Sequence, residues 1–248
     1  MAAERIQKVL ARAGYGSRRQ IEAWISEGRV NVNGKTAQLG DSITPNDRVK
    51  FNGKLVSKSR LFKKNTRILM YHKPEGEVCS RSDPEGRPIV FNQLPKLQNG
   101  RWISIGRLDI ATTGLLLFTT DGELANQFAH PSFALEREYA VRILGEVSDE
   151  AIRQLQAGVM LEDGPAHFDS IIKGGGKGAN HWYHVVIKEG RNREVRRLWE
   201  SQGVTVSRLI RVRFGPINLP KGLKQGKHRE LTDKEVDQIQ RTIKGSDA

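Results

Sequence analysis

The chain has 248 residues, of which 37% are hydrophobic and 28% are charged. This composition is typical of a globular protein that forms one large domain, or a small domain and a medium one. No apolar run approaches the roughly 20 residues needed to span a bilayer, and the N-terminus lacks the layout of a signal peptide. We therefore expect no membrane contact and a cytoplasmic location. The single cysteine, Cys79, excludes an internal disulfide and a multi-cysteine metal site.

Charge is distributed unevenly along the chain, whose net charge is +13. Residues 1–64 hold 14 Lys and Arg against 5 Asp and Glu, a net of +9, whereas the remaining residues hold 27 against 23, a net of +4. Lys and Arg that neutralise phosphates release counterions and so favour binding to nucleic acid. The asymmetry favours a small basic module that binds a polyanion over a merely solubilising surface.

A compact unit is predicted over residues 3–58. It begins with two short helices, the second of which starts at Ser17, where Gln20 completes a capping box. Asn33-Gly34 and Asn52-Gly53 are strong hairpin signals between short alternating strands. Two helices followed by short strands make a small but foldable module.

Two segments of this unit resemble the S4 RNA-binding domain, which is named after a small-subunit ribosomal protein. They are residues 8–14, running on to Ser17-Arg18-Arg19, and residues 28–34. The resemblance implies that the second helix and the adjoining basic loop lie against structured RNA. The candidate contacts are Arg12, Arg18 and Arg19. A DNA-binding helix-turn-helix is the alternative, and the hairpin directly after the second helix argues for RNA.

A second, larger domain is predicted over residues 67–243, after a basic linker at residues 59–66 and before a disordered tail at residues 244–248. Many short strands with alternating hydrophobicity are interspersed with helices, and the two do not alternate regularly. This pattern favours an α+β fold around a mixed, largely antiparallel sheet.

An acidic loop stands out in this larger domain. Arg107 and Asp109 follow the apolar run that ends at Ile105, and the chain then returns into the very apolar segment that begins at Leu115. A carboxylate on a loop between two buried strands is well placed for chemistry. Taken alone, the pattern favours an Asp that merely caps a turn.

Four segments in order resemble pseudouridine synthases of the RsuA/RluB type. Gly106-Arg107-Leu108-Asp109, followed by Thr113-Gly114, resembles the signature of that family. The other three are Lys73-Pro74-Glu75-Gly76, Arg137-Glu138-Tyr139-Ala140-Val141 and the arginine motif, Glu189-Gly190-Arg191-Asn192-Arg193-Glu194-Val195-Arg196-Arg197-Leu198. Together with the front module, the resemblance covers nearly the whole chain, and four motifs in order are far more specific than one.

The resemblance implies roles for individual residues. Asp109 is the catalytic carboxylate, Tyr139 stacks on the target uracil, and Arg196 pairs with Asp109. Arg107 displaces the target base or holds its phosphate, and Leu198 lines the pocket. RNA contacts are further expected from Lys73, Arg191 and Arg193. The alternatives are that Tyr139 is an ordinary core aromatic and that the arginines form a solvated helix face.

The implied reaction isomerises uridine to pseudouridine and needs no cofactor. The glycosidic bond breaks, the uracil turns, and the ring rejoins through carbon, without redox change or external energy. An arginine beside Asp109 favours the charged carboxylate, and a target base extruded from folded RNA costs a few kcal/mol. The six histidines have no standard zinc spacing with acids or Cys79, so we expect no metal.

The target is expected to be large-subunit (23S) ribosomal RNA, in pre-ribosomal particles, with the enzyme acting as a monomer. Residues 83–88, residues 119–125 and the arginine motif look closest to the large-subunit members of the family. The competing hypothesis is a non-catalytic factor that binds ribosomal RNA during ribosome assembly. The combination of Asp109, Tyr139 and Arg196 discriminates between the two, because binding alone does not require it.

Overall fold

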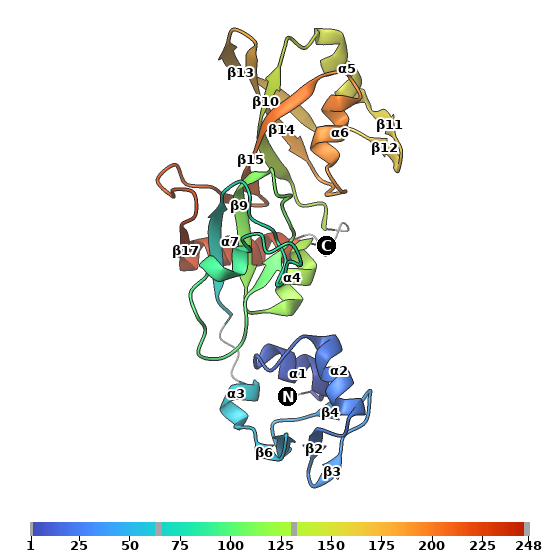
Figure 1. Ribbon diagram of the computed structural model, residues 1–248, viewed down its shortest axis with the longest axis vertical. Coiled ribbons are helices and arrows are strands. Elements are labelled where there is room, and N and C mark those ends of the chain that lie inside the picture. Colours follow the sequence, from blue (N-terminus) through green and yellow to red (C-terminus); the bar gives the residue numbers. More distant parts are fainter. Residues whose placement is uncertain (1, 63–65, 130–132, 246–248) are drawn as a thin grey trace. The chain divides into compact units, whose positions relative to one another are not determined.

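The computed structural model describes residues 2–62, 66–129 and 133–245, which divide into two compact units (Figure 1). The first unit comprises Met1–Arg67, Pro95–Ile103 and Thr120–Gly122, and the second comprises Ile68–Leu94, Ser104–Thr119 and Glu123–Ala248. None of the described helices has the length and apolar character that a membrane crossing requires.

The first unit contains both predicted helices and both predicted hairpins. Its helices are α1 (Ile6–Arg12) and α2 (Arg18–Ser26), and the Ser17–Gln20 capping box is formed. A four-stranded sheet has the order β3-β2-β5-β6. Asn33 and Gly34 turn the first hairpin with φ of 52° and 90°, values that the type I′ turn requires. The strands are β1 (Glu4–Arg5), β2 (Val30–Val32), β3 (Lys35–Thr36), β4 (Ser42–Ile43), β5 (Val49–Phe51) and β6 (Lys54–Leu55).

The segment predicted as a basic linker is partly folded. Residues Lys58–Phe62 form helix α3, and Leu61 is buried in the hydrophobic core of the first unit. The sequence shows no periodicity here because a five-residue helix has only one or two apolar anchors, and such a helix is stabilised by packing rather than by propensity. Of the rest of the predicted linker, residues 63–65 lie outside the described residues, and the Thr66 hydroxyl donates to the Asp121 carboxylate at 3.3 Å.

A mixed nine-stranded sheet forms the centre of the second unit. Its main path is β13-β14-β10-β15-β9-β7-β17, with β8 paired to β9 and β16 paired to β15. The β9–β15 pair is parallel, whereas the pairs β7–β9, β7–β17, β10–β14, β10–β15, β13–β14 and β15–β16 are antiparallel, as expected for a mixed, mainly antiparallel sheet. The strands are β7 (Ile68–Lys73), β8 (Ile103–Ile105), β9 (Thr113–Thr119), β10 (Arg137–Leu144), β13 (Ser170–Lys177), β14 (Asn180–Ile187), β15 (Thr205–Phe214), β16 (Ile217–Asn218) and β17 (His228–Glu230).

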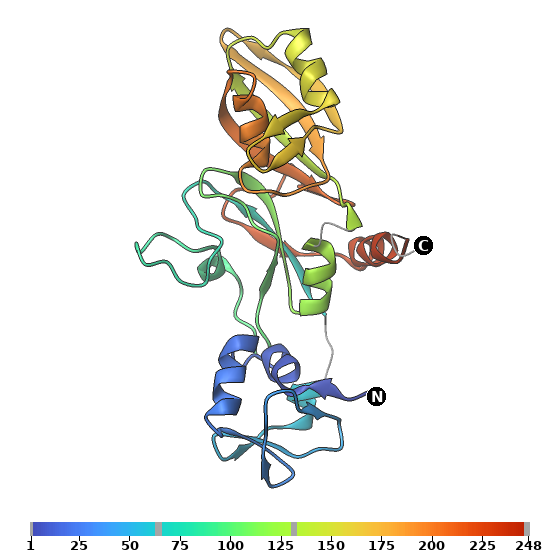
Figure 2. The same ribbon diagram turned by 90° about the vertical axis from the view of Figure 1, so that its right-hand side faces the viewer.

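Helices cover the two halves of this sheet differently. Helices α5 (Asp149–Ala157) and α6 (Glu194–Glu200) and the hairpin of β11 (Val159–Leu161) and β12 (Gly164–Ala166) lie together on one face of β13-β14-β10-β15 (Figure 1). Helices α4 (Gly122–Ala129) and α7 (Asp233–Gly245) lie on one side of the β9-β7-β17 half (Figure 2). A short 3-10 helix spans Val90–Gln93.

The C-terminal end of the chain partly falls outside the structure. Helix α7 extends to Gly245, so the first two residues of the predicted disordered tail belong to the helix. The remaining three, residues 246–248, lie outside the described residues.

The parallel β9–β15 pair depends on a glycine. Gly114 has φ of +107°, and a Cβ added there would lie 2.3 Å from the backbone oxygen of Arg211. The register places Gly114 directly beside Arg211. A side chain would therefore push the two strands apart, which explains why the Thr113-Gly114 motif has a glycine at this position.

Substitution Gly114→Ala is expected to destabilise the protein by about 3–5 kcal/mol, because a positive-φ penalty adds to a backbone clash. Gly86→Ala is the matched control, since Gly86 also has positive φ, +70°, but nothing lies within 4 Å of an added Cβ. The control should lose only about 1–2 kcal/mol. Urea unfolding of both variants measures the difference, and equal losses would contradict the close approach of the strands.

Candidate active site

A cleft of about 550 Å³ opens on the helix-covered face of the sheet. Its lining comes from four places: the loop 106–112, the sheet strands β10, β14 and β15, the segment 188–195 that leads into α6, and Ala129 at the end of α4. Asp109, Tyr139 and Arg107 all contribute to this lining. The structure thus brings together residues from three of the sequence motifs that are far apart along the chain.

Asp109 lies in the loop between β8 and β9 and is half-buried. Its backbone oxygen accepts a hydrogen bond from the Thr112 amide at 3.0 Å, which closes a turn. Next to it, Leu108 is buried and its amide donates to the Cys79 Sγ at 3.5 Å. Within the described residues, the Asp109 carboxylate makes no hydrogen bond or ion pair. The backbone is therefore fixed while the carboxylate stays available to a ligand.

Three consecutive backbone carbonyls after Asp109 are held by buried cations. The Nζ of Lys73 donates to the oxygens of Ile110 and Thr112 at 3.3 and 2.9 Å. The Nη2 of Arg196 donates to the oxygen of Ala111 at 2.9 Å. Hydrogen bonds from charged donors are stronger than neutral ones. These contacts fix the conformation of the loop directly behind the carboxylate.

Arg196 does not form the predicted ion pair with Asp109. Its guanidinium is buried, and Nη1 donates to the Val206 oxygen at 2.9 Å. Burial lowers the pKa of Arg196, Arg193 adds to that effect, and the charge of Asp109 opposes it. Arg196 is therefore near enough to influence Asp109 electrostatically, but its hydrogen bonds go to backbone carbonyls. A sequence motif identifies such an arginine, but it does not show whether the guanidinium donates its hydrogen bonds to a side chain or to the main chain.

Lys73 cannot contact RNA in this structure, contrary to the prediction. Its side chain is 0% exposed, and its third hydrogen bond goes to the Pro74 oxygen at 2.9 Å. Burial lowers the pKa of the Lys73 ammonium, while Cys79 and Glu77 oppose the shift. A lysine is usually exposed, which is why sequence alone favours a phosphate contact. Here the three carbonyls satisfy its three donors.

Tyr139 lies on the floor of the cleft and is only 9% exposed. In the sheet register its neighbours are Val185 on β14 and Arg211 on β15. Both the ring and Asp109 line the cleft, which leaves space beside them for a planar ligand.

Two buried arginines that the sequence analysis did not select also line the cleft. Arg211 is 2% exposed and donates from Nε to the Leu115 oxygen at 2.8 Å, but its Nη2 has no hydrogen-bond partner among the described residues. Arg137 donates to the backbone oxygens of Leu135 and Glu189. Both guanidiniums pack against the Phe214 ring, at 4.8 and 4.9 Å. The sequence did contain a sign of Arg211. It stands two residues after Leu209 on the same predicted strand, so its side chain points to the face of the sheet that Leu209 buries.

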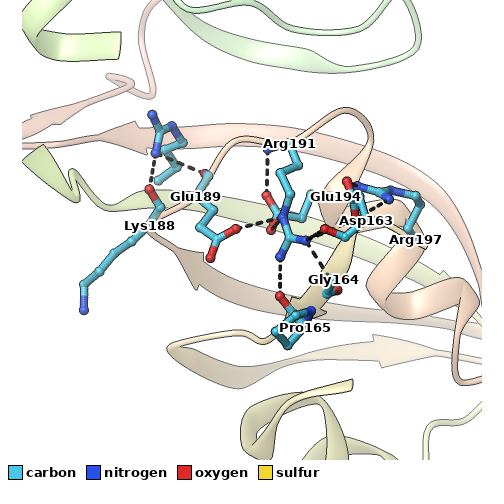
Figure 3. A network of polar contacts seen from close by, with 9 residues as sticks. Asp163, Gly164, Pro165, Lys188, Glu189, Arg191, Glu194 and Arg197 are labelled. Atoms are coloured by element: carbon cyan, nitrogen blue, oxygen red, sulfur yellow. Dashed lines mark hydrogen bonds and ion pairs between the residues drawn. The ribbon is translucent and has the colours of Figure 1, made fainter. Parts of the chain in front are cut away.

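Arg191 is used internally rather than left free for RNA. Its guanidinium donates to the oxygens of Gly164 and Pro165 and pairs with Asp163 and Glu194 (Figure 3). Arg197 binds the same Asp163 carboxylate with two hydrogen bonds of 2.8 Å. These contacts tie the β11–β12 hairpin to the segment that leads into α6. Arg191 therefore shapes the rim of the cleft.

The remaining predicted residues are distributed as follows. Leu198 is fully buried in α6 and is not part of the cleft lining. Arg107 is exposed at the cleft, and Arg193 lies there with a left-handed φ of 49° and an ion pair to Glu200. In the first unit, Arg12 is bound to Glu4 by two hydrogen bonds and to the Leu61 oxygen.

Arg18 and Arg19 differ from Arg12. Both are exposed in the first turn of α2. Within the described chain, neither side chain has a hydrogen-bond or ion-pair partner. Among the predicted contacts of the first unit, these two are the guanidiniums that a phosphate could reach without displacing a partner.

The described residues contain no group of three or more His, Cys, Asp or Glu side chains that could hold a metal ion. The groups that converge on the cleft are instead one free carboxylate, one phenol and several guanidiniums. Such a site can bind an anionic nucleotide and can offer a carboxylate as base or nucleophile.

Comparison with known proteins identifies the class. The family described as RNA pseudouridylate synthase matches residues 67–201, and the S4 domain matches residues 4–49. The chain belongs to the family of RNA pseudouridine synthases, with an S4 domain in front. A crystal structure of a pseudouridylate synthase has a TM-score of 0.66 to this chain, with 27% identity over 95% of this chain and 99% of that one.

The chain is similar to three relatives named ribosomal large subunit pseudouridine synthase B. It is 60% identical over 94% of its length to the relative from Pseudomonas aeruginosa, of which it spans 61%. It is 57% identical to the relative from Yersinia pestis and 60% identical to that from Escherichia coli K12, over 97% and 92% of its length. It spans 76% and 79% of those two proteins.

Substitution Lys73→Met tests the role of the buried lysine. It removes two hydrogen bonds to the loop behind Asp109, so kcat should fall about 100-fold, the scale of a 1 Å misplacement of a catalytic group. The Kd for RNA should stay unchanged, because Lys73 is not exposed. Lys234→Met is the control, as Lys234 is exposed on α7 and loses the same charge. A weakened Kd with unchanged kcat would restore the RNA-contact prediction.

Proposed function

We propose that this chain isomerises a specific uridine to pseudouridine in 23S ribosomal RNA, with Asp109 as the catalytic carboxylate. The observation that carries the proposal is a carboxylate with no protein partner among the described residues, on a loop fixed from behind, in a cleft whose floor is a tyrosine ring. The large-subunit target is supported by the names of the relatives, which are 57–60% identical to this chain.

The reaction rearranges bonds within one nucleotide. The bond between the ribose and the ring nitrogen breaks, a bond between the ribose and a ring carbon forms, and the proton lost from that carbon is balanced by one gained at the nitrogen. A charged carboxylate can attack, stabilise the intermediate or remove a proton from the ribose. Asp109 serves each of these routes because its oxygens are not occupied by donors from the described part of the protein.

Binding of the flipped base falls to Tyr139 and the cleft around it. Extruding a uridine from folded RNA costs a few kcal/mol, and stacking on an aromatic ring returns about 1–3 kcal/mol. Tyr139 is nearly buried at the cleft floor, so the contact is shielded from water. Arg107, which is exposed at the cleft, displaces the target base or holds its phosphate.

Arg196 and Lys73 act on the reaction through the backbone. They hold the carbonyls of residues 110–112 and thereby set the direction in which Asp109 points. We assign both as positioning residues. Precise catalysis requires that the reacting group be held by a supporting layer of contacts.

The setting we propose is the cytoplasm, where a monomer acts on ribosomal RNA within pre-ribosomal particles. The S4 domain anchors the enzyme through Arg18 and Arg19 on α2, whose guanidiniums are exposed and unpaired in the described residues.

Substitution Asp109→Asn should abolish pseudouridine formation, by a factor on the order of 10³–10⁴, as expected when a catalytic group is removed at constant shape. Binding of ribosomal RNA should persist. Asp237→Asn, an exposed position on α7, is the matched control. The measurement is pseudouridine mapping in large-subunit RNA from cells that lack the gene and carry either variant. Restoration of the lost site by the Asp109→Asn variant would refute the catalytic assignment.

Arg18→Gln with Arg19→Gln tests the S4 anchor. Loss of two phosphate contacts should lower the slope of log Kd against log salt by about 1.4–1.8. Turnover at saturating RNA should be unaffected, because neither residue lies in the cleft. The measurement is RNA binding across a series of salt concentrations, and an unchanged slope would mean that α2 does not face phosphate.

A further inference from the structure

The sheet face opposite the cleft carries no helix over β13-β14-β10-β15 within the described residues (Figure 1). Successive side chains of a strand point to opposite faces. Because Tyr139 lines the cleft, Ala140 and Arg142 on the same strand face the other way. Exposure agrees with an open surface: Ile172 on β13 is 62% exposed, and its neighbour across the sheet is His184.

One cluster on this open face combines an aromatic ring with two arginines. Arg142 on β10 is directly opposite Trp182 on β14 and directly opposite Arg208 on β15. Directly opposed side chains share a face, with Cβ atoms about 5 Å apart. The guanidinium of Arg142 lies 5.9 Å from the centroid of the Trp182 ring, within the range of a cation–π contact.

The two arginines have no counterion in the described part of the chain. Arg142 donates from Nε to the Ser207 Oγ at 2.9 Å, and Arg208 is exposed. Neither forms an ion pair with a described residue. Like charges directly opposite each other on a sheet are destabilising. An arrangement that costs stability and leaves two guanidiniums facing solvent fits an anion that binds between them.

The neighbouring carboxylate on this face is already occupied. Glu138 accepts hydrogen bonds from Arg213 and His184, both at 3.0 Å. Arg213 also pairs with Glu136 at 3.0 Å. These contacts keep the negative charges away from Arg142 and Arg208, so the cluster remains positive.

The sheet is also irregular where the arginines meet. The register between β10 and β15 shifts after Arg142, so that Ser207 is the extra residue of a bulge. Bulges redirect side chains and are frequent near functional sites. Here the hydroxyl of Ser207 both supports Arg142 and donates to the Arg142 oxygen at 3.0 Å, which orients the guanidinium beside the tryptophan.

We propose that Trp182, Arg142 and Arg208 form a second RNA site, which binds an unpaired nucleotide of the substrate RNA on the face of the sheet opposite the catalytic cleft. The indole stacks on the base, and the two guanidiniums hold the adjoining phosphates. Aromatic rings with nearby cations bind single-stranded nucleic acid in this manner. The inference rests on the proposed function only in that the substrate is RNA.

The experiment uses the full chain and a fluorescein-labelled 12-nucleotide oligouridylate that contains 4-thiouridine for photocrosslinking. The variants are Arg142→Gln with Arg208→Gln, and Trp182→Leu. The control is Arg153→Gln with Arg241→Gln, two exposed arginines on α5 and α7 that carry the same charge change. Binding is measured by anisotropy across salt concentrations, and crosslinked peptides are mapped by mass spectrometry.

We expect crosslinks at residues 180–184 of β14, around Trp182, in the unsubstituted chain and in the control, and their loss in both site variants. The arginine variant should bind about 10-fold more weakly, with a salt slope lower by about 1.4. Trp182→Leu should weaken binding about 10-fold at an unchanged slope. Crosslinks that avoid residues 180–184, including crosslinks found only at Ile187 in the cleft, or an arginine variant that binds like the control, would overturn the proposal.

Pseudouridine formation by the unsubstituted chain on 23S RNA is measured in parallel. Absence of product there would count against the proposed function and leave the crosslinking result to decide the second site. The two failures are therefore distinguishable.

Discussion

The site depends on the hydrogen bonds that two buried cations donate to the loop behind Asp109. Lys73 and Arg196 come from opposite ends of the domain sequence and meet the carbonyls of residues 110–112. A buried ammonium is costly unless its donors are all satisfied, and here the structure satisfies the Lys73 donors with backbone oxygens. These hydrogen bonds stabilise the loop, so the backbone at Asp109 is held without a partner for its carboxylate.

In this arrangement the contacts that orient Asp109 do not bind its charged carboxylate. A carboxylate paired with arginine would be oriented by the same bond that competes with the substrate. Asp109 is oriented through its main chain, so a ligand meets both of its oxygens. The unpartnered Nη2 of Arg211 and the buried Arg137 nearby add positive potential to the cleft, which suits a ligand that carries phosphate.

The sequence predicted the architecture well where local chemistry decides it. The Ser17 capping box, the Asn33-Gly34 turn and the mixed, mainly antiparallel sheet all follow from short-range signals. The sequence also selected Asp109 and Tyr139, which the structure brings to one cleft. The predictions failed where a long polar side chain is buried. Lys73 was predicted to contact RNA, yet it is fully buried and binds backbone carbonyls. The RNA contact of Arg191 stays a prediction, although its guanidinium already binds Pro165 and Glu194.

The reason for these failures is physical. A sequence does not show whether the charged group of a lysine or arginine binds a phosphate, water or a backbone oxygen. The three-dimensional arrangement of acceptors determines which of these it binds. The helix at Lys58–Phe62 was missed for a related reason, because Leu61 is fixed by tertiary packing rather than by any periodic pattern.

The parallel pairing of β9 with β15 has a consequence for the order in which the enzyme folds during its synthesis. Gly114 and Arg211 are neighbours in the sheet although they lie far apart along the chain. Contacts of such long range form slowly and late. The S4 domain, residues 4–49, is synthesised first, whereas the strand Thr205–Phe214, whose Leu209 and Arg211 line the cleft, comes near the end of the chain. The cleft is therefore completed only after nearly all of the second unit has been synthesised, long after the S4 domain.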